Sequence, residues 1–536
     1  MSDFLNQLDE KVPDIEIPLP APITEEQEDN HLTTFKNIKS VLFDEVEKIK
    51  RDAYNRAYQE YMLEHENAED KTARAYAEKA RKKATPNTPL AVAIILKKYI
   101  HFTRIKPEGQ NQKAPLYFYH PDKGIYTEDN ELLQDLMATI YPNITERQAI
   151  DTLYKISHSV PLKNKQNNFV VIGSELYNNQ TGEFNPFNPN VIATRKVKAE
   201  YNPNVTEPTI NGWKPTEWLR GLFNHDKESY DLAIQIIRAT VTGKTLDNIF
   251  WLHGVGGTGK GTFQALLENL VGAENTASFK IDEKNGRFDT SILIGKSVVI
   301  GDDVQKDVVI KDTSIVFSLA TGDPIRIEDK GKRPYTTRLK MTVVQSSNGF
   351  PRMNADKNAI NRRFRVLSFS ELKGKPDKRI KNDYINRPEV LEYLVKLAIE
   401  TPFKDIEPQR SIDFLNEEYK EMNPVADFVD RFFNDDVIQC KYVPNGYVFE
   451  CFKAYCKQHQ NSKYFLNEVS LHTEIKSLLP KSFRPKKVTI PKGKRFHKNF
   501  NPKLVFNPWH FDTYYNGREH EENQNKSKTE RGYERV

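Results

Sequence analysis

The stretch "GVGGTGKGT" at residues 254–262 constrains the fold of this chain more than any other feature. It follows the apolar run "NIFWLH" and precedes the helix-like "TFQALLENLVG". Glycines between a buried strand and a helix let backbone N–H groups turn toward phosphate oxygens, and the helix start adds its dipole. Further strands alternate with helices after this loop. The pattern therefore predicts an α/β nucleotide-binding core with a largely parallel sheet.

The lysine of this loop, Lys260, is expected to face the β- and γ-phosphates of ATP. The next position usually holds a Ser or Thr that ligates Mg²⁺, but here it is Gly261. Thr262 follows and is expected to hold the metal directly or through water. "GKGT" also occurs in nucleotide kinases, so a small-molecule phosphotransferase is an alternative. The residues expected to bind the nucleotide are Gly254, Gly256, Gly257, Thr258, Gly259, Lys260, Gly261 and Thr262.

Three later motifs supply candidate catalytic residues. "SVVIGDDV" reads as a buried strand that ends in two acids: Asp302 would hold Mg²⁺ through its water shell, and Asp303 would polarise the attacking water. In "KMTVVQSSNGFPRM" a strand ends at Asn348, whose amide can bind the γ-phosphate and that water. In "NAINRRFRVLSF", Arg362 and Arg363 are candidates for an arginine finger that reaches a neighbouring subunit. The structural alternatives are a strand end capped by acids, an Asn-Gly turn and a salt-bridged arginine pair.

Together these motifs resemble, in order and over Gly254–Phe369, the superfamily-3 replicative helicases of phages, plasmids, genomic islands and large DNA viruses. The resemblance implies an AAA+-type ATPase core, ATP and Mg²⁺ as cofactors, and a homo-hexameric ring around single-stranded DNA. It also implies 3′-to-5′ movement and a role in replication initiation, with Arg363 as the arginine finger. The family's DNA-contacting hairpin corresponds to "RIEDKGKRPYTTRLK", with Lys330, Lys332 or Arg333 at its tip.

The resemblance extends beyond the ATPase core. "FYHPDKGIYT" and "NNFVVIGSELYNNQTGEFNPFNP" are similar to the helicase-associated domain of the phage and plasmid group, and the end of the chain is similar to its winged-helix region. No primase domain is expected, because residues 1–85 are too few and too helical. The expected segments are a disordered acidic N-terminus (1–32), a charged helical arm (33–86), a mixed α/β helicase-associated domain (87–210), the AAA+ ATPase and helicase domain (211–423), a winged-helix-like domain (424–515) and a disordered tail (516–536).

Residues 481–503, near the C-terminus, form a basic stretch that predicts contact with the phosphates of double-stranded origin DNA. Its candidate DNA-binding residues are Lys486, Lys487, Lys492, Lys494 and Arg495. A domain that mainly docks proteins is the alternative. A zinc site of Cys440, Cys451, Cys456 and His459 is disfavoured, because Cys451 and Cys456 lack knuckle spacing and fit ordinary helix packing.

Composition limits the compartment and the partners. Three cysteines in 536 residues argue against a disulfide framework, and no apolar run reaches the length of a membrane span. A soluble protein of the bacterial cytoplasm, without membrane contact, is expected. The acidic N-terminus and the charged helices are expected to dock host or element replication proteins or to help ring assembly. A non-enzymatic alternative is an origin-binding or loading protein that uses ATP as a switch.

Overall fold

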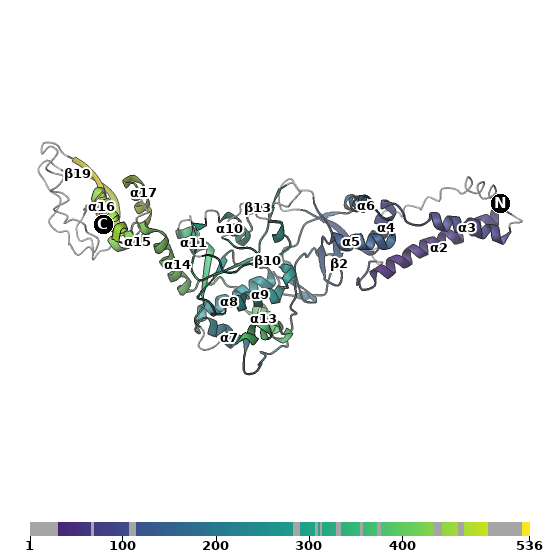
Figure 1. Ribbon diagram of the computed structural model, residues 1–536, viewed down its shortest axis with the longest axis horizontal. Coiled ribbons are helices and arrows are strands. Elements are labelled where there is room, and N and C mark those ends of the chain that lie inside the picture. Colours follow the sequence, from purple (N-terminus) through teal and green to yellow (C-terminus); the bar gives the residue numbers. More distant parts are fainter. Residues whose placement is uncertain are drawn as a thin grey trace. The chain divides into compact units, whose positions relative to one another are not determined.

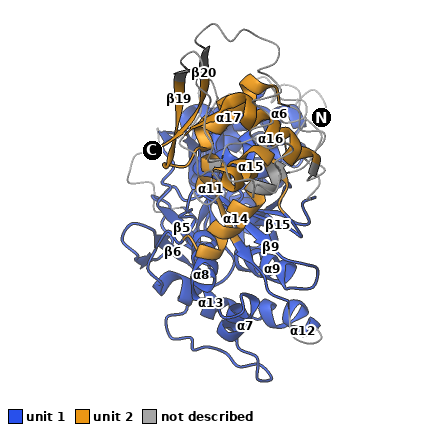
Figure 2. Ribbon diagram, turned by 90° about the vertical axis from the view of Figure 1, so that its left-hand side faces the viewer, with its two compact units in different colours: residues 1–305, 312–349, 367–406 blue, residues 306–311, 350–366, 407–536 orange. Residues whose placement is uncertain are grey.

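The computed structural model describes residues 31–65, 69–106, 114–281, 290–305, 309–310, 313–327, 334–353, 357–371, 377–433, 442–458, 466–490 and 528–536. The chain forms two compact units, which are coloured separately in Figure 2. Unit 1 comprises residues 1–305, 312–349 and 367–406. Unit 2 comprises residues 306–311, 350–366 and 407–536.

Unit 1 begins with two helices that pack side by side, α2 (Ile38–Glu64) and α3 (Asp70–Lys83) (Figure 1). The alanines that α3 buries are spaced three or four residues apart, so they share one face of the helix. They are Ala73, Ala77 and Ala80. Their small side chains let α3 approach Ala57 of α2 closely. The charged arm expected over residues 33–86 is therefore a helical pair, and it ends before "TPNTP".

A small sheet with the strand order β3-β2-β1-β4 follows, packed against three helices. Its strands are β1 (Phe102–Ile105), β2 (Leu116–His120), β3 (Ile125–Thr127) and β4 (Leu162–Lys163). The helices are α4 (Pro89–Tyr99), α5 (Asn130–Ile140) and α6 (Glu146–Ser159). Local capping fixes where α6 starts, because Thr145 and Gln148 form a reciprocal capping box.

A second small sheet has the order β7-β6-β5-β8. Its strands are β5 (Phe169–Ile172), β6 (Glu175–Asn178), β7 (Phe184–Asn185) and β8 (Lys196–Val197). Val170, Ile172 and Val197 belong to the same hydrophobic core as the helices that cover the central sheet. The backbone N–H of Ala199 also donates to the carbonyl of Leu270 at 3.0 Å. Packing is thus continuous across the domain boundary expected at residue 210.

The central sheet has the order β10-β11-β15-β9-β17. Its strands are β9 (Ile249–His253), β10 (Thr276–Ser278), β11 (Val298–Gly301), β15 (Thr342–Ser347) and β17 (Phe364–Ser368). The neighbours β10 and β11, β11 and β15, and β15 and β9 are parallel. Every residue of β15 is buried, as expected for a strand covered on both faces. The predicted parallel α/β core is confirmed.

Helices pack on this sheet around one hydrophobic core. The longest helices that contribute to it are α8 (Lys227–Thr242), α9 (Lys260–Val271) and α13 (Pro388–Glu400), which lie together in Figure 1. Shorter elements complete the unit: α7 (Pro215–Leu222), η2 (Ala273–Asn275), η3 (Thr290–Leu293), α10 (Ser314–Thr321), α12 (Lys378–Asn382) and η4 (Tyr384–Asn386).

The structure contains both strands of the hairpin that was expected between β11 and β15. β13 (Pro324–Ile327) and β14 (Tyr335–Arg338) pair antiparallel, with Ile327 opposite Tyr335. The residues of its tip, 328–333, lie outside the described ranges.

Unit 2 contains the short parallel pair β12 (Val309–Ile310) and β16 (Arg352–Met353), and the helices α11 (Lys357–Arg363) and α14 (Gln409–Met422). Its larger part has the helices α15 (Pro424–Phe432), α16 (Asn445–Gln458) and α17 (Glu468–Leu478). Its strands are β18 (Tyr442–Pro444), β19 (Phe483–Ile490) and β20 (Lys528–Arg535), in the order β18-β20-β19. An aromatic core holds these elements together.

The expectation of a disordered tail is wrong for Lys528–Arg535, which forms β20 and pairs antiparallel with β19 (Figure 2). Tyr533 is buried in the aromatic core, and Glu534 accepts from Arg484 at 2.8 Å and from Lys486 at 2.7 Å. Those two cations lower the pKa of Glu534. Apolar burial of Tyr533 and charge pairing of the next residue, Glu534, therefore order a segment that looks merely polar in the sequence. None of the helices in the described ranges is both long and apolar enough to cross a bilayer.

Candidate active site

Residues predicted from separate motifs meet at the carboxyl edge of the central sheet. The glycine-rich loop follows β9, Asp302 and Asp303 follow β11, and Asn348 follows β15. Because these three strands are parallel neighbours, their carboxyl ends lie at the same edge. The edge therefore combines a phosphate loop, two carboxylates and an amide within unit 1.

Close packing around the loop requires glycine at particular positions. Gly254, Gly257 and Gly259 have φ values of 152°, 84° and 99°, a region that L side chains rarely adopt. A Cβ at Gly259 would lie 2.6 Å from Leu222 Cδ2, and one at Gly254 would lie 2.9 Å from the carbonyl oxygen of Phe369. The loop is thus seated tightly against the end of α7 and the segment after β17, which holds its backbone N–H groups in place.

Lys260 lies at the centre of the site. Its ammonium donates to the carbonyls of Gly254 and of Val255, the latter at 3.0 Å, and to Asn348 Oδ1 at 3.1 Å. Partial burial lowers the pKa of Lys260, while the carboxylates of Asp302 and Asp303 act in the opposite direction. The lysine and the asparagine, 88 residues apart in the chain, are therefore in direct contact.

The acidic pair is held by a residue that sequence reasoning missed. Ser346 is fully buried in β15, and its hydroxyl donates to Asp302 Oδ1 at 2.6 Å. The same hydroxyl accepts from the backbone N–H of Asp303 at 3.2 Å. Asp303 has a φ of 55°, an unusual conformation for a residue other than glycine. Ser346 thus fixes the orientation of Asp302 and the turn that carries Asp303. Both acids are exposed. In the sequence, the two serines at the end of this apolar strand could have indicated such a role.

The residue before Ser346, a buried glutamine, also stabilises this edge of the sheet. Gln345 accepts from the backbone N–H of Ile281 at 3.0 Å and donates to the carbonyl of Phe279 at 3.0 Å. A Cβ at Gly301 would lie 2.2 Å from Gln345 Oε1. The glycine before the two acids therefore makes room for the glutamine, which ties the segment after β10 to β15.

Replacing Ser346 with alanine is expected to lower ATP turnover roughly tenfold to a hundredfold, the usual effect of losing a partner behind a metal-site ligand. Because Asp302 would no longer be oriented, the Mg²⁺ concentration for half-maximal turnover should rise, and excess Mg²⁺ should restore part of the rate. Steady-state turnover in a Mg²⁺ titration measures both. Ser347→Ala is the matched control, since the Ser347 hydroxyl accepts from the backbone N–H of Gly349 at 3.1 Å and, within the described residues, contacts neither acid. Equal Mg²⁺ curves for the two variants would contradict a positioning role for Ser346.

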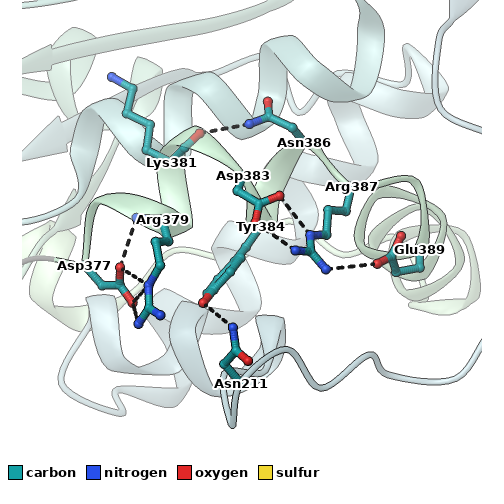
Figure 3. Close-up of polar contacts among 9 residues, drawn as sticks. All are labelled: Asn211, Asp377, Arg379, Lys381, Asp383, Tyr384, Asn386, Arg387 and Glu389. Carbon is teal, nitrogen blue, oxygen red and sulfur yellow. Dashed lines mark hydrogen bonds and ion pairs between the residues drawn. The ribbon is translucent and has the colours of Figure 1, made fainter.

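Lys381 is a second residue that the sequence did not single out. Gly261, in the first turn of α9, has space for a side chain, and Lys381 Nζ lies 3.7 Å from the position that its Cβ would take. Figure 3 shows the Lys381 side chain extending away from the ion pairs Asp377–Arg379 and Asp383–Arg387. The place usually occupied by a hydroxyl thus has an ammonium group nearby.

The structure places the arginine candidates in unit 2. Arg362 and Arg363 form the last turn of α11, immediately before β17; Arg362 is exposed and Arg363 is half-buried. Of the C-terminal basic candidates, Lys486 and Lys487 are exposed on β19, where Lys486 pairs with Glu534 at 2.7 Å. The others lie outside the described residues: Lys330, Lys332, Arg333, Lys492, Lys494 and Arg495.

Cys451 and Cys456 lie in the hydrophobic core of unit 2. Burial raises the pKa of Cys451 to about 12 and that of Cys456 to about 11. This agrees with the helix packing expected for them, while Cys440 and His459 fall outside the described ranges. Within the described residues, no three His, Cys, Asp or Glu side chains gather into a possible metal site.

Comparison with known proteins gives matches to three family models. The model described as "D5 N terminal like" matches residues 42–219, and "Poxvirus D5 protein-like" matches residues 420–516. Between them, residues 252–363 match a family of unknown function (DUF5906). No curated protein matches the chain.

Solved structures that match the chain include two apo structures of the NrS-1 C-terminal region. They are 14% identical, cover 76% of this chain and 88% or 97% of their own, and superpose with TM-scores of 0.40 and 0.45. The X-ray structure of JCV helicase is 14% identical over 39% of this chain and 60% of its own, with a TM-score of 0.21.

The D5-like models match the chain on both sides of the nucleotide loop, and the loop, the acidic pair and the asparagine converge between the matched regions. The chain is therefore similar, on both sides of the nucleotide loop, to the D5-like superfamily-3 helicases of the phage and virus primase–helicase type.

Proposed function

We propose that the chain is the motor of a ring-forming DNA helicase that hydrolyses ATP at the carboxyl edge of its central sheet. The contact between Lys260 Nζ and Asn348 Oδ1 at 3.1 Å carries this proposal. This contact joins the lysine proposed to bind phosphate to the asparagine proposed to sense it. In this arrangement the loop glycines and the N-terminus of α9 hold the phosphates, and Asp303 polarises the attacking water.

Mg²⁺ fits the donor set at this edge. Asp302 offers an exposed carboxylate that Ser346 orients, and Thr262 follows Gly261 in the first turn of α9. Mg²⁺ is commonly bound by one or two carboxylates together with water and substrate phosphates. Asp302 and Thr262 would hold the ion, which supplies charge neutralisation between the phosphates. Lys381 would add a second cation beside them, where Gly261 leaves space.

The DNA-binding role is proposed for the β13–β14 hairpin and for unit 2. The hairpin follows α10, which contacts β15 and β9, so its arms are connected to the strands that carry the nucleotide motifs. Lys330, Lys332 and Arg333 would contact phosphates of a single strand in the pore. The C-terminal domain of unit 2, proposed as a winged helix, would bind duplex origin DNA.

A ring is proposed because we assign Arg363 the role of a finger that acts on a nucleotide bound to another subunit. A homo-hexamer that initiates replication of a phage, plasmid or genomic island satisfies this need. The helical pair of α2 and α3 would help ring assembly or contact host replication proteins.

Two assays test the proposal together. We expect single-stranded DNA to stimulate ATP hydrolysis, and we expect a forked duplex to be separated only when ATP and Mg²⁺ are present. Stimulated hydrolysis without strand separation would instead support the ATP-switched loader. Hydrolysis that is indifferent to DNA, with phosphate transfer to a small acceptor, would support the phosphotransferase. Either result would overturn the proposed helicase.

A further inference from the structure

A cavity of about 540 Å³ lies at the edge of the central sheet opposite to the nucleotide loop. Its lining includes Lys244–Asp247, Gly295–Lys296 and Arg338–Met341, which lead directly into β9, β11 and β15. The nucleotide motifs follow the other ends of these same strands. With β9 five residues long, the cavity and the loop are separated by about 17 Å of strand. The cavity is therefore distinct from the site described above.

Six cations and two carboxylates line this cavity. The cations are Lys165, Arg195, Lys244, Lys296, Arg338 and Lys340. Asp247 is already engaged by Lys340, whose ammonium lies 2.6 Å from its carboxylate. The cavity thus keeps an excess of positive charge, which attracts an anion.

Several of these cations are held in place by backbone carbonyls. Arg195 donates to the carbonyl of Lys340 at 2.6 Å, Lys296 to that of Glu274 at 2.6 Å, and Arg338 to that of Gly322 at 3.1 Å. A carbonyl oxygen orients a cation but does not cancel its charge, so these side chains remain able to pair with phosphates. Arg338 ends β14, so the cavity begins at the base of the hairpin.

One aromatic side chain stands among these charges. Phe403 lines the cavity with 36% of its surface exposed, and Lys244 Nζ lies 4.3 Å from its ring centroid. Proteins that bind single-stranded nucleic acid combine a basic groove for phosphates with aromatic platforms for bases. A cavity of this volume accommodates a ligand of nucleotide size.

We infer that this cavity binds single-stranded DNA, with phosphates against Lys296 and Arg338 and a base stacked on Phe403. The inference rests on the proposed DNA-binding function and adds a contact at the base of the hairpin, away from its tip. The strand would lie along the edge of the sheet where β9, β11 and β15 begin.

The experiment uses the full chain and an oligodeoxythymidine that carries a fluorophore and one 5-iodouracil. Fluorescence anisotropy over a salt series gives the affinity, and ultraviolet crosslinking followed by peptide mapping gives the contact. We expect a crosslink at Phe403. Phe403→Ala should weaken binding roughly fivefold to a hundredfold, the range for losing one stacked base, whereas Phe403→Tyr should bind like wild type. Lys296→Gln with Arg338→Gln should make the salt dependence shallower by about 1.4, or about 0.7 for each lost phosphate contact.

Lys227→Gln is the matched charge control. Lys227 begins α8, whose other end leads into the cavity, and its side chain is exposed and paired with Asp231. It should change neither affinity nor salt slope. Unchanged binding by the cavity variants, with crosslinks elsewhere, would overturn this inference while leaving the helicase standing. Wild-type protein that binds no oligonucleotide would instead overturn the proposed function. Labelling of Phe403 by 8-azido-ATP but not by the oligonucleotide would mark a small-nucleotide site and also overturn the inference.

Discussion

Lys260→Ala is expected to lower ATP turnover roughly a hundredfold to a thousandfold, the loss that follows removal of one preorganised group from a developing charge. The reason is the position of the ammonium, which the loop carbonyls and Asn348 hold at the carboxyl edge of the sheet. Strand separation should be lost with turnover. Steady-state phosphate release and a forked-duplex assay measure the two effects.

The fold should survive this substitution. Burial lowers the pKa of Lys260, which means that the folded chain disfavours its charged form. Alanine removes that cost, so the unfolding temperature should not fall below that of a matched Lys227→Ala control, whose lysine is exposed at the start of α8. A variant that unfolds early would attribute the lost turnover to structure, and one that hydrolyses ATP at the wild-type rate would remove Lys260 from the site.

The sequence predicted the strands, the loop and the helix around the candidate site because each depends on local pattern. A buried strand, a glycine turn and a helix start are neighbours in the chain, so "NIFWLH" and "GVGGTGKGT" specify β9, the loop and α9 without distant information. The same holds for the strand before Asp302 and for the strand before Asn348. Parallel pairing then brings the motifs to one edge, which is a general property of such sheets.

What the sequence did not predict depends on contacts between distant residues. The hydrogen bond from Ser346 to Asp302 spans 44 residues, and the approach of Lys381 to Gly261 spans 120. No periodicity marks such pairs. The prediction of a disordered tail failed for the same reason. "KTERGYER" is polar by composition, and it forms β20 because β19 pairs with it and Tyr533 packs in the aromatic core.

Arg363→Ala is expected to lower DNA-stimulated turnover by roughly a thousandfold or more, the contribution of an arginine finger supplied by another subunit. Arg363 is the last residue of α11 and directly precedes β17. Contacts with α14 hold α11 in place. Because Arg363 would act on a neighbour's nucleotide, the variant should still bind ATP with wild-type affinity. A fluorescent ATP analogue measures binding, and phosphate release measures turnover. Arg362→Ala, one residue earlier and more exposed, is the matched control and should lose far less.

Mixing the two inactive variants decides whether the sites are shared. A ring that contains Lys260→Ala and Arg363→Ala subunits includes some interfaces with an intact loop on one side and an intact finger on the other. If Arg363 acts across subunits, an equal mixture should recover part of the wild-type turnover, and recovery should require conditions under which subunits exchange. A finger that acts within its own chain gives no such interface, because every subunit carries one defect. No recovery with confirmed mixed rings would therefore assign Arg363 to its own nucleotide and remove the main argument for a ring.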